Sequence, residues 1–228
     1  MNKATTVSSN KSQKVKHLIA VIDDEHDLLD LYEMLLTPLG EVQVFSSPEE
    51  FIERMNTDKG FKPDVIITDY NMPNMNGVKM IQTIHRPDAP IASILLSGYL
   101  DKDKSIAACN AGIGNILEKP VVKSDLVLLT KELLLEARSK KIQEEMSDVM
   151  KKLKEMFLWF RMLCMNELDL KSMHQQGVVS ADKGPEDQAH SLEESLQELE
   201  DKLTQLAEDK IQLDREVQQL NKRRGRAA

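Results

Sequence analysis

The stretch Val65–Gly77, VIITDYNMPNMNG, decides the fold of the first half of the chain. It opens with a short apolar run, Val65–Thr68, which leads directly into an acidic residue, Asp69. A run that is apolar at successive positions, and not only at every second one, is typical of a parallel strand covered on both faces. The Pro, Asn and Gly residues that follow indicate a loop. We therefore predict a buried strand that presents Asp69 at its carboxyl end.

Similar apolar runs lie on either side of this stretch, with helical patterns between them. The other runs are His17–Ile22, Val42–Phe45, Ile91–Leu96 and Ile113–Leu117, and the helix candidates are Glu25–Leu36, Pro48–Asn56, Val78–His85, Lys102–Ala111 and one that starts near Ser124. The helix starts carry suitable signals, such as Ser47 followed by Pro48 and two acids. Five successive strand–helix units predict a doubly wound α/β domain with a five-stranded parallel sheet.

The composition changes after this domain, because residues 124 to about 175 contain neither Gly nor Pro and read as one long helix. A loop with Gly177, Gly184 and Pro185 follows, and then a final helix, about Ala189–Arg223. We predict a disordered tail at 1–15, the α/β domain at 16–137, a continuous helical extension at 138–176, a loop at 177–188, a coiled coil at 189–224 and a tail at 225–228.

Both C-terminal helices carry heptads of apolar residues. The final helix has a leucine at every seventh position, namely Leu192, Leu199, Leu206, Leu213 and Leu220, and Leu196, Leu203, Lys210 and Val217 lie between them. Leucine at d and a single lysine at a favour two strands. The earlier helix has Ile142, Met146, Val149, Leu153, Met156, Phe160 and Leu163. Since the two series are out of phase, a helical hairpin, doubled by dimerisation into a four-helix bundle, fits better than one rod. A parallel homodimer and a heteromeric coiled coil stay open.

The bulk properties exclude several classes of protein. A net charge of -8 and a pI near 5.3 argue against nucleic-acid binding by the whole chain, which requires a basic surface. The tail Met1–Gln13 lacks the apolar core of a signal peptide, and the longest apolar stretch is far shorter than the ~20 residues of a spanning helix. Cys109 and Cys164 have no metal or redox spacing. We expect a cytoplasmic protein with reduced thiols.

Chemistry-bearing residues gather at the predicted strand ends. The first strand ends in Asp23-Asp24, the third in Asp69, the fourth in Ser97 and the fifth in Lys119-Pro120. Ligands of parallel sheets bind at these carboxyl ends, so we expect one shared crevice. Clustered carboxylates require a cation, and oxygen ligands suit Mg²⁺. Beside Mg²⁺ and an ammonium group, an Asp can attack a phosphoryl donor.

These motifs, with Asp69 to Gly77, Leu96-Ser97-Gly98 and Glu118-Lys119-Pro120, resemble the receiver domain of two-component response regulators, over about Lys16–Ala137. The resemblance implies a flavodoxin-like fold with Asp69 as phosphoacceptor. It implies that Asp24, Asp69 and the Asn71 carbonyl ligate Mg²⁺ and that Asp23 reaches the ion through water. It also implies that Ser97 and Lys119 bind the phosphoryl group. The Lys119-Pro120 bond is expected to be cis. Ile116 departs from the family, which often has Tyr or Phe there as a rotamer switch.

The implied partners are a histidine kinase or phosphotransfer protein, a second copy of the chain bound through the C-terminal helices, and an unidentified downstream protein. We expect neither a specific nucleic acid nor a separate catalytic domain. A phosphatase with a nucleophilic Asp is a weak alternative, because it needs a second acid where Asn71 stands. Two others are a constitutive coiled-coil scaffold that uses the receiver for docking and the regulatory part of a larger enzyme.

The apolar cluster Met156–Met165 has two interpretations. Clusters of Met and aromatic residues are most often core, and this is the first interpretation. The second is a docking surface, since Met side chains adapt to a partner.

Overall fold

The computed structural model describes residues 17–84, 91–99, 101–175 and 185–227, and the side chains of these residues except in 159–193 and beyond 222. The predicted N-terminal tail lies outside these residues. The chain divides into two compact units, with the boundary between Leu134 and Leu135.

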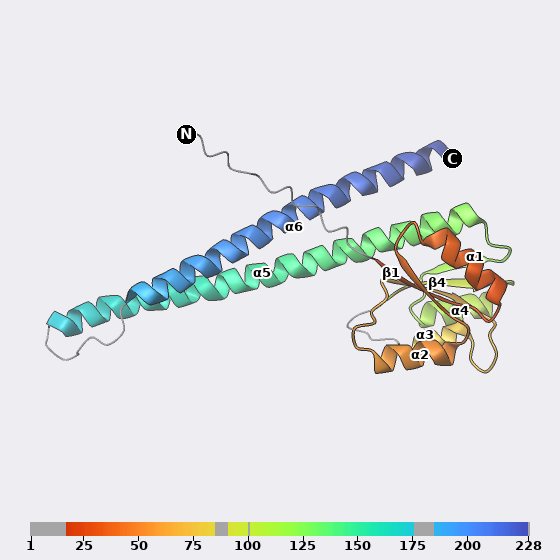
Figure 1. Ribbon diagram of the computed structural model, residues 1–228, viewed down its shortest axis with the longest axis horizontal. Helices are drawn as coiled ribbons and strands as arrows, with labels where there is room; N and C mark the ends of the chain where they lie inside the picture. Colours follow the sequence, from red (N-terminus) through yellow and green to blue (C-terminus); the bar gives the residue numbers. More distant parts are fainter. Residues whose placement is uncertain (1–16, 85–90, 100, 176–184, 228) are drawn as a thin grey trace, which may run out of the picture. The chain divides into compact units, whose positions relative to one another are not determined.

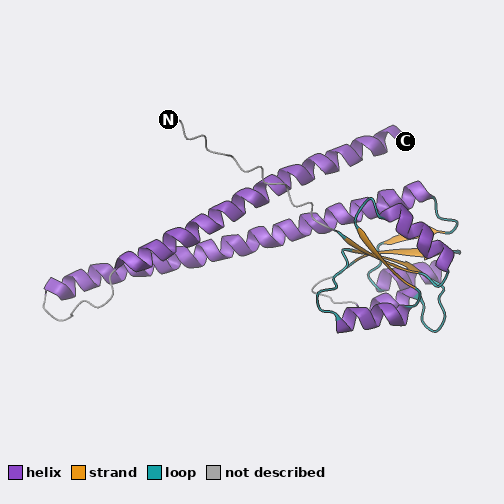
Figure 2. Ribbon diagram, viewed as in Figure 1, coloured by secondary structure: helices purple, strands orange, loops and turns teal. Residues whose placement is uncertain are grey.

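The first unit is a five-stranded, all-parallel sheet with helices on both faces (Figures 1 and 2). The strands are β1 (Leu18–Ile22), β2 (Glu41–Phe45), β3 (Val65–Asp69), β4 (Ala92–Ser97) and β5 (Asn115–Glu118), in the spatial order β2-β1-β3-β4-β5. The helices are α1 (His26–Leu36), α2 (Pro48–Thr57), α3 (Gly77–Ile84), α4 (Lys102–Asn110) and the start of α5 (Lys123–Gln175). The predicted fold class is therefore confirmed, and the predicted element ends in this unit lie within about two residues of the observed ones.

The strand that ends in Asp69, β3, lies at the centre of the sheet. It pairs with β1 on one side and β4 on the other, and all five of its residues are buried. Hydrophobic clusters cover both faces. One contains side chains of α1 and the start of α5, such as Leu29, Leu36 and Leu126. The other lies under α2, α3 and α4. Burial on both faces explains the unbroken apolar runs.

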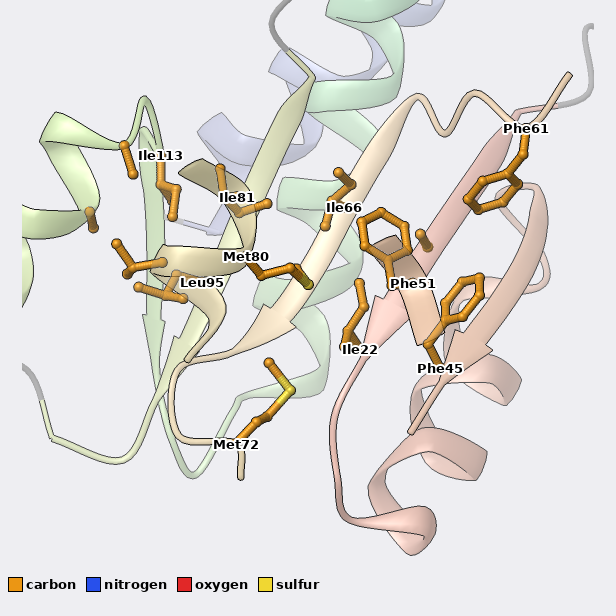
Figure 3. Packing of buried hydrophobic residues seen from close by; sticks show 14 residues of the cluster. Ile22, Phe45, Phe51, Phe61, Ile66, Met72, Met80, Ile81, Leu95 and Ile113 are labelled. Carbon is orange, nitrogen blue, oxygen red and sulfur yellow. The ribbon is translucent and has the colours of Figure 1, made fainter. Parts of the chain in front are cut away.

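Three phenylalanines anchor the second cluster. Phe45, Phe51 and Phe61 meet edge to face, with ring centroids 5.2 to 6.1 Å apart (Figure 3). This is the geometry that aromatic quadrupoles favour. The start of α2 is fixed nearby, since the Ser47 hydroxyl accepts a hydrogen bond from the Glu50 N–H and Pro48 begins the helix.

The second unit consists of the remainder of α5 and of α6 (Pro185–Ala227). The long helix predicted for residues 124–175 is confirmed. The predicted loop and C-terminal tail are partly wrong, because α6 begins four residues earlier than expected and continues to Ala227. Pro185 suits the first helical position, acids follow it, and the arginines near the other end favour the helix C-terminus. Residues 176–184 lie outside the described part.

The two helices of this unit form an antiparallel hairpin (Figure 1). Arg138 Nη1 of α5 lies 3.5 Å from Glu216 Oε1 of α6. Ile142 and Val149 are buried on α5, and so are the heptad leucines Leu206, Leu213 and Leu220 of α6, while Leu199 is half-buried. The predicted hairpin is confirmed. Leu206, Leu213 and Leu220 are not a free zipper for a parallel homodimer, because they are already buried within one chain.

Some predicted heptad positions cannot be placed in this hairpin. The side chains of Phe160, Leu163 and Leu192 lie outside the described part of the chain. Among the described residues, neither α5 nor α6 is long and apolar enough to span a membrane, and the same holds for the helices of the first unit.

Candidate functional site

Two buried carboxylates and one ammonium group meet at the carboxyl edge of the sheet. Asp69 is the last residue of β3, and Asp23 follows β1 directly. Their exposed fractions are 5% and 0%. Lys119 follows β5 and lies with its Nζ 2.6 Å from Asp69 Oδ1 and 3.0 Å from Asp23 Oδ2. The structure thus brings together three of the predicted site residues, from three different strands.

The backbone holds this lysine and the first acid in place. The Lys119 N–H donates to the Ser97 carbonyl over 2.8 Å, and the Lys119-Pro120 peptide bond is cis, as the resemblance implied. The Asp23 N–H donates to the Phe45 carbonyl, and Asp23 Oδ1 accepts from the Glu25 N–H over 3.0 Å. Lys119 and Asp23 are therefore each fixed to a neighbouring strand or helix start.

The loop after β3 orients Asp69. Its Oδ2 accepts a hydrogen bond from the Asn71 N–H over 2.6 Å. The Gly77 N–H closes the loop by donating to the Tyr70 carbonyl over 3.2 Å, and Asn74 adopts a left-handed φ of 63°, which Asn tolerates well. Gly77 packs so tightly that a Cβ there would collide with the Asp69 carbonyl and the Thr68 hydroxyl. The glycine that ends the deciding stretch is thus required by this close approach.

The charges of the site are strongly coupled. Burial raises the pKa of Asp69, because desolvation disfavours the carboxylate, and this outweighs the opposing effect of Lys119. Burial by itself would lower the pKa of Lys119, but its bonds to Asp69 and Asp23 raise that pKa overall. Lys119 is therefore a permanent cation, and the carboxylate beside it stays costly to charge.

The other predicted residues lie around this centre. Ser97 is fully buried, and its hydroxyl donates to the Tyr99 carbonyl over 2.9 Å. Asp24 and Asn71 are exposed at the rim. Ile116 is half-buried and packs against the cluster under α2, α3 and α4. The aliphatic side chain at this position is thus part of the core.

The donor set fits a hard divalent cation. Asp23, Asp24, Asp69 and the Asn71 carbonyl offer oxygen alone, which Mg²⁺ prefers. Among the described residues, no three His, Cys, Asp or Glu side chains are grouped so that they could hold a metal ion by themselves. The raised pKa of Asp69 favours a bound cation, since a second cation would relieve the cost of its charge.

Sequence reasoning missed two residues beside the site. Glu25 Oε1 lies 3.9 Å from Lys119 Nζ, and its position directly after two acids was the available signal. Tyr32 is buried on α1. Burial and the nearby acids raise the pKa of its hydroxyl, and they outweigh Lys119, which lowers that pKa. Tyr32 shares the helical face of Leu29 and Leu36, a spacing that could have placed it.

Known proteins resemble the first unit. The family model of the response regulator receiver domain matches residues 19–131. The phosphoglycerate transport system transcriptional regulatory protein PgtA of Salmonella typhimurium is 30% identical over 122 residues, which cover 53% of this chain and 29% of PgtA. The transcriptional regulatory protein PrrA of Mycobacterium leprae is 32% identical over 117 residues, which cover 51% of this chain and 49% of PrrA.

A solved structure shares the same fold. The receiver domain protein (CheY-like) from Methanospirillum hungatei JF-1 is 25% identical, with a TM-score of 0.50, and the match covers 55% of this chain and 98% of that one. This chain spans about half, or less, of the length of the two curated relatives named above. The similarity to all three proteins thus concerns about half of this chain.

Proposed function

We propose, from the premise that residues 19–131 are a response regulator receiver domain, that the chain is a two-component response regulator and stores a phosphoryl group on Asp69. The observation that carries this proposal is the position of Asp69, buried at the end of β3 with Lys119 Nζ 2.6 Å from its Oδ1. A nucleophilic carboxylate beside a permanent cation suits phosphoryl transfer, which depends on positioning and charge neutralisation.

In the proposed reaction an Asp69 carboxylate oxygen attacks the phosphorus of a phosphohistidine on a kinase or phosphotransfer protein. The new O–P bond replaces the N–P bond, and the departing imidazole takes up a proton. Lys119 is close enough to bind a phosphoryl oxygen in place of one of its present carboxylate contacts. When bound by Asp23, Asp24, Asp69 and the Asn71 carbonyl, Mg²⁺ would supply further neutralising charge.

The acyl phosphate should persist instead of being hydrolysed quickly. Asn71, two residues after Asp69, carries an amide that is too weak an acid to protonate a leaving group and too weak a base to activate water. The same residue weighs against the phosphatase alternative.

The proposed output is a change in protein–protein contacts made by the C-terminal helices, with a second copy of the chain as one partner. Helix α5 runs without a break from the first unit into the second, so a rearrangement around Ser97 and α4 has a continuous element through which to act. The curated relatives named above are transcriptional regulators by name, but the match covers only 29% and 49% of their lengths. We propose a cytoplasmic location.

Treatment of the full chain with Mg²⁺ and acetyl phosphate, followed by intact-mass measurement, tests this function. We expect a gain of one phosphoryl group that Asp69→Asn abolishes and that the control Asp30→Asn, an exposed acid of α1, retains. No gain in the wild-type chain, or a gain that survives Asp69→Asn, would contradict the proposal. The first of these outcomes favours a constitutive scaffold.

A further inference from the structure

Helix α5 carries a second apolar stripe beside the one that is buried in the hairpin. Met146, Met150, Leu153 and Phe157 follow one another at steps of four, three and four residues, which is the spacing of a single helix face. Val149 is buried, whereas Met150 and Phe157 are 59% and 65% exposed. Met146 and Leu153 also belong to the heptads of α5 and are half-buried, so the stripe begins at the edge of the hairpin seam and extends to the exposed Met150 and Phe157.

The Arg138–Glu216 ion pair fixes which residues of α6 lie beside this stripe. In an antiparallel pair, each step forward on α5 matches a step back on α6, since both helices rise by the same amount per residue. Met150 is twelve residues beyond Arg138 and so lies at the level of Leu203 and Thr204. By the same reasoning Phe157 lies at the level of Leu196.

Leu196 and Leu203 belong to the same side of the hairpin as Met150 and Phe157. On α5, Met150 follows the buried Val149, and its side chain is rotated by about 100° clockwise from that of Val149 when the helix is viewed from its N-terminus. On α6, Leu203 lies three residues before the buried Leu206. Because α6 runs in the opposite direction, the side chain of Leu203 is rotated from that of Leu206 toward the same side of the hairpin. Leu196 is accordingly 37% exposed and Leu203 half-buried. We call this surface the hairpin face: Met146, Met150, Leu153, Phe157, Leu196 and Leu203.

We propose that the hairpin face binds the same face of a second copy of this chain, so that two hairpins form a four-helix bundle. The proposal deepens the dimer named in the proposed function by assigning it a surface. Since Leu206, Leu213 and Leu220 are already buried within each chain, the two copies associate through the a positions of α6 and the second stripe of α5. The hairpin face is a compact apolar surface whose burial would drive association.

Charge selects a second copy as the occupant. Exposed lysines, including Lys154, lie beside the apolar stripe of α5, and exposed acids, including Glu200, lie beside that of α6. The register places Lys154 and Glu200 at the same level, sixteen residues from the reference ion pair on each helix. When two hairpins stack face to face about a two-fold axis along the bundle, α5 of one copy lies against α6 of the other. Lys154 then faces the partner's Glu200 twice, once on each side, as an isologous interface requires.

Analytical ultracentrifugation of the full chain tests this interface. We expect a wild-type dimer, and for Phe157→Glu a dimer dissociation constant raised roughly a hundredfold, because a charge enters the centre of the bundle. The matched control is Leu158→Glu, which alters an apolar residue that is 49% exposed on the neighbouring, outward side of the same helix. This control should remain dimeric. Circular dichroism checks that both variants keep their helix content.

A charge reversal provides a second test that does not introduce a charge into the apolar surface. Lys154→Glu and Glu200→Lys should each weaken the dimer roughly fivefold, and the double variant should restore it. A monomeric wild-type chain overturns the inference, and so does a dimer that Phe157→Glu leaves intact. Loss of binding to anionic vesicles in Phe157→Glu, with no dimer at any concentration, would assign the face to a membrane surface instead. Since none of these measurements needs phosphorylation, their outcome is separate from that of the Asp69 test.

Discussion

Lys119 Nζ lies 2.6 Å from Oδ1 of Asp69, and the same ammonium group lies 3.0 Å from Oδ2 of Asp23. One cation thus neutralises two carboxylates that burial would otherwise make costly. The arrangement holds the acids in the folded state, and in the proposed reaction the same ammonium group binds a phosphoryl oxygen.

Removing this cation should destabilise the first unit. For Lys119→Met we expect the free energy of unfolding at pH 7 to fall by about 2 kcal/mol, somewhat less than for a fully buried pair because the lysine side chain is 19% exposed. Added Mg²⁺ should recover part of the loss by replacing the missing charge. Urea denaturation measures both effects, with the exposed Lys102→Met as control. A loss equal to that of the control would show that the ion pairs contribute nothing.

Stability should depend on pH through Asp69. Since burial raises its pKa in the folded state, the folded chain holds a proton at a pH where the unfolded chain has released it. Folding is then linked to proton uptake by Asp69. The contribution of Asp69 to stability therefore increases as the pH falls through the raised pKa of the folded state toward the ordinary pKa of 3.8. We expect Asp69→Asn to be more stable than wild type at pH 7, with a difference that shrinks toward about pH 4. Urea denaturation at several pH values measures the difference in stability between the variant and the wild type. If this difference stayed constant between pH 7 and about pH 4, the pKa of Asp69 would not be raised in the folded state.

The close approach of Gly77 to the Asp69 carbonyl predicts a steric effect. Gly77→Ala should lower the free energy of unfolding by about 1 to 3 kcal/mol, because the new methyl group has to displace backbone. It should also slow phosphoryl uptake, since the loop that orients Asp69 must shift. The matched control is Gly114→Ala, where a Cβ meets nothing within 4 Å. Thermal unfolding and the rate of mass gain measure the two effects, and equal behaviour of both variants would refute this account.

Ser97 should act in readout and not in the transfer itself. Its hydroxyl now donates to the Tyr99 carbonyl, so binding a phosphoryl oxygen requires that bond to break, and this frees the carbonyl of a residue just before α4. We expect Ser97→Ala to gain the phosphoryl group as wild type does, while the phosphorylation-dependent change in hydrogen exchange of α4 is lost. If Ser97→Ala failed to become phosphorylated, the hydroxyl would have a role in the chemistry that this geometry does not give it.

The ion pair that fixes the hairpin register should be measurable but small. Arg138 Nη1 and Glu216 Oε1 are 3.5 Å apart, and Gln212 Nε2 also donates to this oxygen over 3.1 Å. A double-mutant cycle with Arg138→Met and Glu216→Gln should give a coupling energy of about 0.5 to 1 kcal/mol at low salt, as expected of partly exposed pairs. The coupling should decrease in high salt. No coupling at low salt would mean that the register is set by apolar packing.

The sequence predicted the sheet well because strand identity is a local property. Runs such as Val65–Thr68 are apolar throughout only when both faces of a strand are covered, and this pattern also placed Asp69 at a strand end. The boundaries of the second unit were predicted less well. Pro185 read as a loop signal, whereas it begins a helix, since proline is compatible with both settings.

What the sequence determined by itself is which residues lie at the strand ends and which residues form heptads, because both follow from the period of apolar positions along the chain. Only the tertiary structure decided how these residues are used. The 2.6 Å contact of Lys119 with Asp69 and the burial of Leu206, Leu213 and Leu220 within one chain depend on residues that no local period connects. Heptads specify a seam but not its partner, and the pairing of α5 with α6 leaves Met150 and Phe157 on the outside.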